Sequence, residues 1–193
     1  ALDGTSGPGV AEARSRLAAQ PRAPNAEATA RRLPACRFLP EAIGECMFAD
    51  PALAAALAMI EDELSWRHNP NYSDAAMGQA GYMDAYAYAE VIGPGGLLAG
   101  NDFLLGLMIL GPGLRYPDHV HPAPELYRVL SGDSTWSRDG GGFEPREPGD
   151  WVWHASGVVH AMTTRDRPLL ALYIWTDRVA EAARLVQAKP GAV

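Results

Sequence analysis

The sequence predicts a mainly β fold of the α+β class, with a small β-barrel or jelly roll preceded by a helical N-terminal region. Two changes along the chain carry this prediction. Helix-favouring Ala, Arg and Glu are frequent before Gly81, whereas β-forming residues with period-two alternation follow it. Glycine clusters at 93–96 and 139–142 then separate short segments. Short strands joined by frequent turns are typical of barrels and jelly rolls.

The chain is long enough for one domain, or for a domain with an appendage. It has 193 residues, of which 48% are apolar, so we expect a large core. We expect three parts: residues 1–80 form a helical region packed on the barrel, residues 81–176 form the barrel, and residues 177–193 form a C-terminal helix and tail. The last helix should cover Asp177–Ala188.

Three helices are expected in the N-terminal region, at Val10–Gln20, Asn25–Arg32 and Asp50–Trp66. The first two follow from their Ala, Arg and Glu content. The third is the clearest, because Asp50 is a favourable N-cap and Pro51 fits the first helical position. Its apolar residues recur at steps of three and four, at Leu53, Leu57, Ile60 and Leu64.

Strands are expected wherever β-formers alternate between turn clusters. They are Tyr82–Ile92, Phe103–Leu110, Leu126–Leu130, Ser134–Arg138, Trp151–His154, Val158–Thr163 and Leu169–Trp175.

The stretch between Gly113 and Gly132 concentrates polar side chains that can meet in one pocket. Successive side chains of a strand point to opposite faces, so His119 and His121 share a face, and Glu125 and Tyr127 share one too. Two prolines lie between these pairs and interrupt any ladder, so a tight bend should bring the glutamate back towards the histidines.

A further ligand is available between Gly149 and Thr164, where two short strands would carry His154 and His160. Imidazoles with one carboxylate suit a divalent first-row metal such as Zn, Fe, Mn or Ni. Burying such ionisable groups unpaired would cost several kcal/mol each, so a metal site explains the pattern better than a polar core does.

Both stretches resemble the two cupin motifs. The first fits G(X)5HXH(X)3E(X)6G at every defined position: Gly113, His119, His121, Glu125 and Gly132. The second fits G(X)5PXG(X)2H(X)3N at Gly149, Gly157 and His160. It departs at Ala155 and Thr164, which affect turn geometry rather than metal ligation.

Tyr127, two residues after Glu125, with Tyr116 and Trp175, narrows the resemblance to the cupin dimethylsulfoniopropionate (DMSP) lyases of marine bacteria. This resemblance is firm from about Gly111 to Trp175. It implies that Tyr127 is the catalytic base and that Tyr116 and Trp175 are substrate-pocket residues. The metal ligands that it implies are His119, His121, Glu125 and His160.

The implied reaction is a β-elimination that gives dimethyl sulfide and acrylate and needs no organic cofactor. A metal on the substrate carboxylate would act as Lewis acid and would favour the phenolate of Tyr127, whose ordinary pKa of about 10 makes it a poor base. The cationic end of this zwitterionic substrate would bind to aromatic faces.

Other readings of the same residues stay open. A metal-dependent dioxygenase or isomerase would use the same ligands and give Tyr127 no task. A non-catalytic small-molecule sensor or a storage-type cupin would bind without turnover, and a family member could act on a related β-substituted acid. Tyr127 could also be a wall residue beside Glu125.

Several aromatic residues have a structural interpretation. We expect His154 to be a hydrogen-bonded structural residue. Trp151 and Trp153 share a strand face and suit the core or an interface, and a core or subunit contact is expected for Tyr82, Tyr86 and Tyr88.

The resemblance implies a small-molecule substrate as the partner, with a homodimer as a possible assembly. The net charge of −7 and the lack of a basic run argue against nucleic acid. Cys36 and Cys46 fit no zinc or redox motif and should be reduced thiols. We expect a cytoplasmic protein without membrane attachment, since neither a signal peptide nor a span of about 20 apolar residues is present. The first residue is not Met, which leaves a cleaved leader open.

Overall fold

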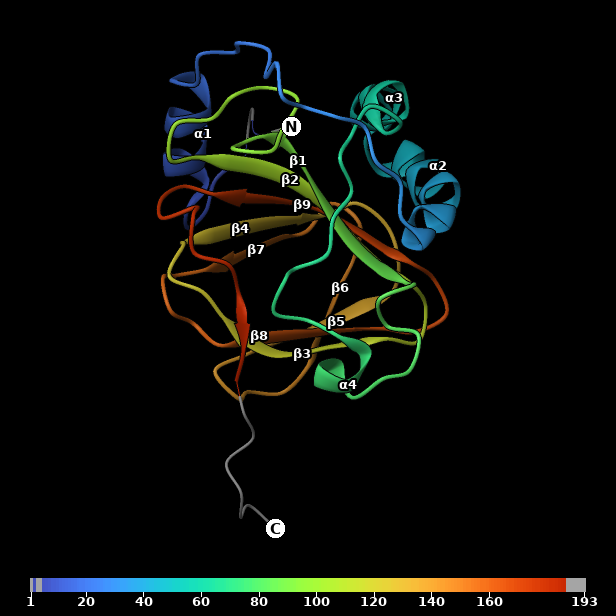
Figure 1. Ribbon diagram of the computed structural model, residues 1–193. Helices are drawn as coiled ribbons and strands as arrows, with labels where there is room; N and C mark the ends of the chain where they lie inside the picture. Colours follow the sequence, from blue (N-terminus) through green and yellow to red (C-terminus); the bar gives the residue numbers. More distant parts are fainter. Residues whose placement is uncertain (1, 3–4, 187–193) are drawn as a thin grey trace.

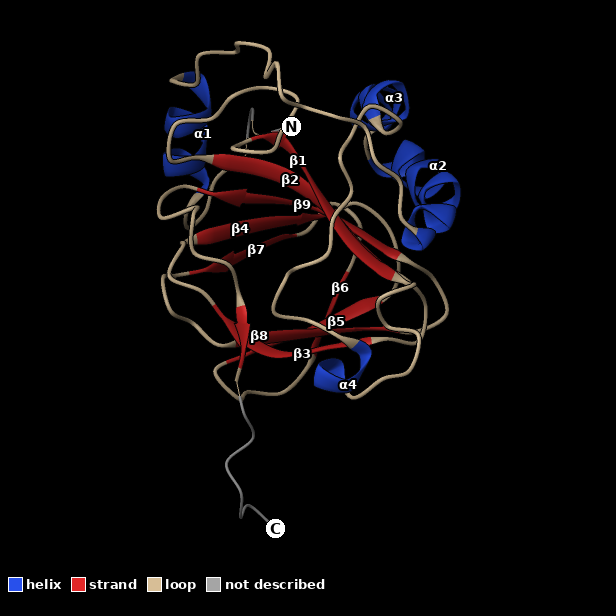
Figure 2. Cartoon of the chain, in the orientation of Figure 1, coloured by secondary structure: helices blue, strands red, loops and turns tan. Residues whose placement is uncertain are grey.

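Two five-stranded antiparallel sheets face each other in the computed structural model, which describes residues 2 and 5–186. One sheet has the order β1-β2-β9-β4-β7, and the other has the order β10-β3-β8-β5-β6. Figure 1 shows the first sheet above the second, with helices on the outside of the first. Figure 2 separates the strands from the surrounding helices and loops. This is the mainly β, jelly-roll architecture that the sequence predicts.

The helical elements precede the strands along the chain (Figure 1). They are α1 (Val10–Ala18), a 3-10 helix (Pro34–Phe38), α2 (Leu39–Ala49), α3 (Pro51–Ile60) and α4 (Asp74–Met77). The strands are β1 (Tyr86–Ile92), β2 (Leu104–Leu110), β3 (Arg115–Val120), β4 (Glu125–Val129), β5 (Ser134–Arg138), β6 (Glu144–Arg146), β7 (Trp151–His154), β8 (His160–Thr164), β9 (Leu169–Trp175) and β10 (Arg184–Leu185).

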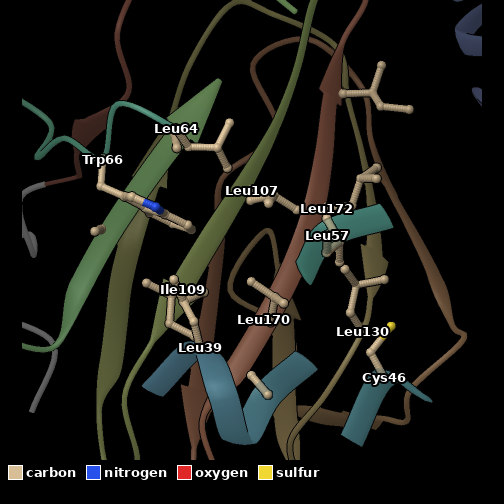
Figure 3. Close-up of a cluster of buried hydrophobic side chains, with 14 of the residues drawn as sticks. Leu39, Cys46, Leu57, Leu64, Trp66, Leu107, Ile109, Leu130, Leu170 and Leu172 are labelled. Carbon is tan, nitrogen blue, oxygen red and sulfur yellow. The ribbon is translucent and has the colours of Figure 1, made fainter. Parts of the chain in front are cut away.

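The first sheet is covered on both faces, and each face has a separate partner. Its outer face packs against α1, α2 and α3 in one apolar cluster. Figure 3 shows the part of this cluster that includes Leu39 and Cys46 of α2 and Leu57 of α3. Leu107, Ile109 and Leu170 of the sheet meet Leu39 and Trp66 of the helical region there, and all five are fully buried. The helical region thus covers the sheet and closes the core. The opposite face turns towards the second sheet, and the aromatic and charged residues gather between them.

The helix start at Asp50 is confirmed. The Asp50 side chain accepts a hydrogen bond from the Leu53 amide, and Pro51 is the first helical residue. The helix ends at Ile60, six residues before the predicted end, and the following residues turn to form isolated bridges with Arg31 and Tyr88. The expected helix at Val10–Gln20 forms as α1, and α2 was not predicted.

Two predicted helices are wrong, and both segments form backbone hydrogen bonds with distant parts of the chain instead. Residues 25–32 form irregular backbone with a turn at residues 26–27, and the Asn25 amide bonds to Leu97 and the Arg31 amide to Leu64. Of the helix predicted at Asp177–Ala188, the described part up to residue 186 forms turns and β10, whose residues pair with Val120 and His119 of β3. Residues 187 and 188 lie outside the described part.

Cys36 and Cys46 are buried free thiols, as predicted. No helix within the described residues is long and apolar enough to cross a membrane.

Candidate metal centre and its cavity

A cavity of about 360 Å³ lies between the two sheets and contains most of the predicted site residues. His119, Glu125 and Tyr127 form part of its wall, together with Tyr116 and Trp175. The register explains why they meet. Glu125 of β4 lies directly opposite Trp175 of β9 in the first sheet, and His119 of β3 lies opposite His160 of β8 in the second. The two facing sheets therefore bring the two sequence motifs together.

Three imidazoles could hold a metal ion. Ring nitrogens of His119, His121 and His160 all lie within 4.8 Å of one another, and all three residues are buried. His121 directly follows β3, so it shares the inward direction of His119 two residues earlier. The exposed fraction of each residue is 4% or less, which removes water as a general partner for the ring nitrogens.

Backbone carbonyls fix the orientation of each ring. The Nδ1 atoms of His119, His121 and His160 lie 2.9, 2.9 and 3.0 Å from carbonyl oxygens two residues away. A carbonyl can only accept, so each Nδ1 donates, and in a neutral ring Nε2 keeps a free lone pair. Hydrogen bonds of this kind, made by the ring nitrogen that does not face the metal, orient metal-binding histidines. The donor set therefore fits a divalent cation.

Glu125 completes the cluster. The tight bend at the two prolines was expected to bring it back towards the histidines, and it does. Its Oε2 atom lies 2.9 Å from His121 Nε2 and 3.2 Å from His160 Nε2. Its Oε1 atom accepts a 2.7 Å hydrogen bond from the Trp175 indole. The Nδ1 atoms of both rings already donate to carbonyls, so in neutral rings the two Nε2 lone pairs face the Glu125 carboxylate. These atoms would repel one another unless a positive charge lies between them, supplied by a proton or by a metal ion.

The pKa values of His119, His121 and Glu125 reflect two opposing effects, burial, which disfavours charge, and pairing between opposite charges. Burial lowers the pKa of His119 well below its ordinary value, and His160 adds to the effect. Burial also disfavours charge on His121, but the charge and hydrogen bond of Glu125 outweigh it and raise the His121 pKa. Burial would raise the pKa of the Glu125 carboxyl, yet His121 holds that pKa well below its usual range. Glu125 and His121 therefore stabilise opposite charges on each other, and a metal ion could supply the positive charge instead.

Tyr127 lies on the cavity wall beside this cluster, on the same strand face as Glu125. Burial raises the pKa of its phenol well above the ordinary value, and the neighbouring Glu125 charge raises it further. Its ring packs edge-on against Trp136 with centroids 4.9 Å apart. The phenol is therefore held firmly, and only a nearby cation would favour its phenolate.

Tyr116 and Trp175 also line the cavity, where each stacks on one histidine. The Tyr116 ring lies parallel to His119 at 4.0 Å between centroids, and its hydroxyl donates to the Tyr72 hydroxyl at 2.8 Å. The Trp175 ring stacks on His121 at 4.5 Å. Both side chains thus support the imidazoles as well as facing the cavity.

The prediction of a hydrogen-bonded His154 is wrong. The ring is buried and stacks on His160 at 4.1 Å, and neither ring nitrogen has a hydrogen-bond partner among the described residues. Burial lowers its pKa to about 3. It sits opposite Glu125 in the β4–β7 ladder, so it packs behind the candidate metal centre without belonging to the three-imidazole group.

The other aromatic residues divide between the two faces of the first sheet. Trp151 and Trp153 pack in the outer cluster, which agrees with the structural interpretation. Tyr82 and Tyr86 are buried in the cluster between the sheets, which agrees with the expected core role, and Tyr88 packs against that cluster. Tyr86 and Tyr88 also line the cavity, which was not expected.

Two further cavity residues, Glu90 and Tyr173, were not predicted from the sequence. A signal for Glu90 was present, because the alternation of Tyr86 and Tyr88 continues to it on the same strand face. Tyr173 could have been found in the same way, two residues before Trp175 on β9.

Comparison with known proteins agrees with this site. Residues 9–171 match the family model described as dimethylsulfoniopropionate (DMSP) lyase. The DMSP lyase DddQ of Ruegeria pomeroyi is 37% identical over 139 residues, which are 67% of this chain and 67% of that protein. A protein of Cereibacter sphaeroides named as a putative DMSP lyase, DddL, is 29% identical over 126 residues, covering 64% of this chain and 50% of its own length.

The folds agree over nearly the whole chain. The crystal structure of DddQ from Ruegeria pomeroyi superimposes with a TM-score of 0.72 and 26% identity, covering 94% of this chain and 99% of that one. The helical region in front of the sheets is thus included in the likeness.

Proposed function

The chain belongs to the DMSP lyase family, and on that premise we propose that it cleaves DMSP to dimethyl sulfide and acrylate by a tyrosine-initiated elimination at a metal centre. The observation that carries the proposal is the single cavity wall shared by Glu125, Tyr127 and two residues of the buried imidazole group, His119 and His121. As a member of this family the protein is a carbon–sulfur lyase.

The proposed reaction needs a base near the α-carbon of the substrate and a firm hold on its carboxylate. DMSP carries a dimethylsulfonium on its β-carbon. When a base removes the α-proton, the C–H electron pair forms the C=C bond and the C–S electron pair leaves with sulfur. The products are neutral dimethyl sulfide and acrylate, and the proton stays on the base. No oxidant or organic cofactor takes part.

We assign His119, His121, Glu125 and His160 as the residues that would hold one divalent ion, such as Zn, Fe, Mn or Ni. When bound, the ion would supply Lewis acidity towards the substrate carboxylate and a positive charge that favours the phenolate of Tyr127. Trp175 would fix the Glu125 carboxylate through its indole N–H.

Tyr127 is our candidate base, because it is the ionisable phenol on the same strand face as Glu125 and on the cavity wall. Tyr116 is assigned to substrate binding rather than to proton transfer, since its hydroxyl already donates to Tyr72. Tyr116 and Trp175 would shape the pocket around the substrate, and the surrounding aromatic faces suit a sulfonium.

Headspace gas chromatography of dimethyl sulfide from purified protein with DMSP tests the proposal, with and without a chelator. We expect release that the chelator abolishes and added metal restores. The variant Tyr127→Phe should lose roughly 100-fold or more of the rate, as is typical when a general base is removed.

A matched control comes from Tyr82→Phe. Tyr82 is fully buried, its hydroxyl has no hydrogen-bond partner among the described residues, and it is absent from the cavity wall. Its variant should keep the rate. A Tyr127→Phe variant with full activity would remove the proposed base and leave the metal assignment standing. Oxygen uptake without dimethyl sulfide would instead favour the oxygenase alternative.

A further inference from the structure

One inward-facing row of the first sheet links the proposed base to a second carboxylate. Register pairs Tyr127 with Tyr173, Tyr173 with Gly106, and Gly106 with Glu90. Residues directly opposite one another in an antiparallel sheet share a face, so the row runs across β4, β9, β2 and β1 on the cavity side. Glu90 and Tyr173 both line the cavity.

Gly106 makes room for an aromatic ring between the two ends of this row. A Cβ atom built on Gly106 would lie 2.6 Å from Cε1 and Cζ of Tyr173, closer than real contacts allow. The Tyr173 ring therefore lies across the space of the missing side chain, on the path from Tyr127 towards Glu90. Burial raises the pKa of the Tyr173 phenol, and the charges of Glu90 and Glu125 add to the rise, as expected for a ring between two carboxylates.

Within the described residues, the Glu90 carboxylate has no positive partner in contact. Its Oε2 atom accepts a 2.7 Å hydrogen bond from the Gly95 amide, and no hydrogen bond within residues 5–186 uses its Oε1 atom. The Arg67 guanidinium approaches the Gly95 carbonyl at 3.4 Å, and no ion pair joins it to Glu90 in the described part of the chain. Burial raises the pKa of the Glu90 carboxyl, and the Gly95 amide and the more distant charge of Arg67 offset only part of that rise. Glu125, the other carboxylate on the cavity wall, is already engaged by His121 and Trp175.

We propose that Glu90 selects substrates with a cationic far end, acting as the counter-charge to that end across the aromatic wall of the cavity. The inference rests on the proposed function, because it places the carboxylate end of the substrate at the histidines. A dialkylsulfonium has neither N–H nor O–H, so it can be recognised only by charge and by ring faces.

The distance decides how Glu90 can act. Three strand spacings of about 4.8 Å separate Glu90 from Tyr127 along the row. This is more than a short zwitterion spans, so Glu90 would act on the cationic end through its charge and not by direct contact. The cation of a bound substrate would lie between Tyr127 and Glu90, and one charge pair about 10 Å apart in a half-buried site changes affinity by about tenfold. Glu90 therefore tunes selectivity without taking part in the chemistry.

The test compares two ligands of nearly equal shape, measured by calorimetry on the metal-loaded protein. One is 3-(trimethylammonio)propanoate, which is cationic at the far end, and the other is its carbon isostere 4,4-dimethylpentanoate, which is neutral there. The wild type should prefer the cationic ligand. In Glu90→Gln, which keeps an acceptor for the Gly95 amide, the cationic ligand should weaken by about tenfold while the neutral ligand changes less than about twofold. With DMSP, KM should rise and kcat should stay the same.

Three results would overturn the proposal: equal weakening of both ligands, no change in either, or no preference for the cation in the wild type. The last measurement needs no variant, so it holds even if the substitution lowers stability. Glu63→Gln changes an exposed glutamate with the same chemistry and should alter neither affinity. Absence of dimethyl sulfide from the wild type would refute the proposed function, whereas these binding results address Glu90 separately.

Discussion

The indole of Trp175 donates a 2.7 Å hydrogen bond to one oxygen of Glu125, whose other oxygen lies 2.9 Å from His121 Nε2. The same indole stacks on His121 with ring centroids 4.5 Å apart. Trp175 therefore restrains both a carboxylate and an imidazole of the candidate metal centre from one position on β9.

Removing this indole N–H should weaken metal binding. In Trp175→Phe we expect a metal affinity about 10- to 100-fold lower, as is typical when a residue that orients a ligand is lost. Competition with a chromophoric chelator measures it. Trp66→Phe is the control, because Trp66 is fully buried and donates to the Glu61 carbonyl far from the cavity wall. It should lower stability and leave metal affinity unchanged; equal affinity losses in both variants would point to general destabilisation.

The stacked pair His154 and His160 should respond differently to substitution. His160 belongs to the three-imidazole group, whereas His154 does not. After dialysis, His160→Ala should retain little metal by inductively coupled plasma mass spectrometry. His154→Phe keeps an aromatic ring against His160 and should retain about one ion per chain. Loss of the ion from His154→Phe alone would assign the fourth position to His154 instead of Glu125.

Asp50 should stabilise the protein only while it is ionised. Its carboxylate caps α3 through the Leu53 amide and lies 2.8 Å from Arg128, and these contacts lower its pKa below 3.8, the amide contributing most. A carboxyl with a lowered folded-state pKa contributes stability above 3.8, and the contribution is lost as the pH falls through the lowered value.

Asp50→Ala should therefore cost about 1–2 kcal/mol of unfolding free energy at pH 7, the usual cost of a lost cap, and less near pH 3. Urea unfolding at both pH values, with chelator present throughout, measures the difference. Asp84→Ala, at an aspartate whose side chain has no hydrogen bond within the described residues, should change little at either pH. A penalty for Asp50→Ala that is the same at both pH values would argue against the ionised cap.

Local sequence signals predicted elements whose partners are close in the chain. Asp50 and Pro51 specify a helix start by themselves, and the spacing of His119, His121 and Glu125 specifies a shared pocket because the bend between them is short. Asn25 bonds to Leu97, 72 positions away, and Arg184 pairs with Val120, 64 positions away. Local composition carries no information about partners at such distances along the chain. Such non-local pairing overrides helix propensity.

Only part of the cavity wall could be predicted from the sequence, because the rest depends on non-local strand pairing. Tyr127 and Trp175 stand in or beside the motif strands, but Glu90 belongs to β1, which reaches the cavity only through β2 and β9. Strand order across the sheet, which depends on long connections, decides that placement. The face of Glu90 could be predicted from alternation, whereas its distance from the histidines could not.

Gly106 gives a last prediction, because it is the point where a side chain would displace Tyr173. Gly106→Ala would place a Cβ atom 2.6 Å from both the Tyr173 ring and the Ala89 carbonyl, so the ring or the β1–β2 ladder must shift. We expect a loss of about 1–3 kcal/mol of unfolding free energy, as for overpacked cores, and a raised KM for DMSP.

Gly44→Ala is the matched substitution, since its Cβ atom would meet nothing within 4 Å on α2. That variant should gain about 0.5–1 kcal/mol from helix propensity and keep its KM, so the two alanines should act with opposite sign in denaturant unfolding. If Gly106→Ala left both stability and KM unchanged, the ring of Tyr173 would not depend on the space above Gly106.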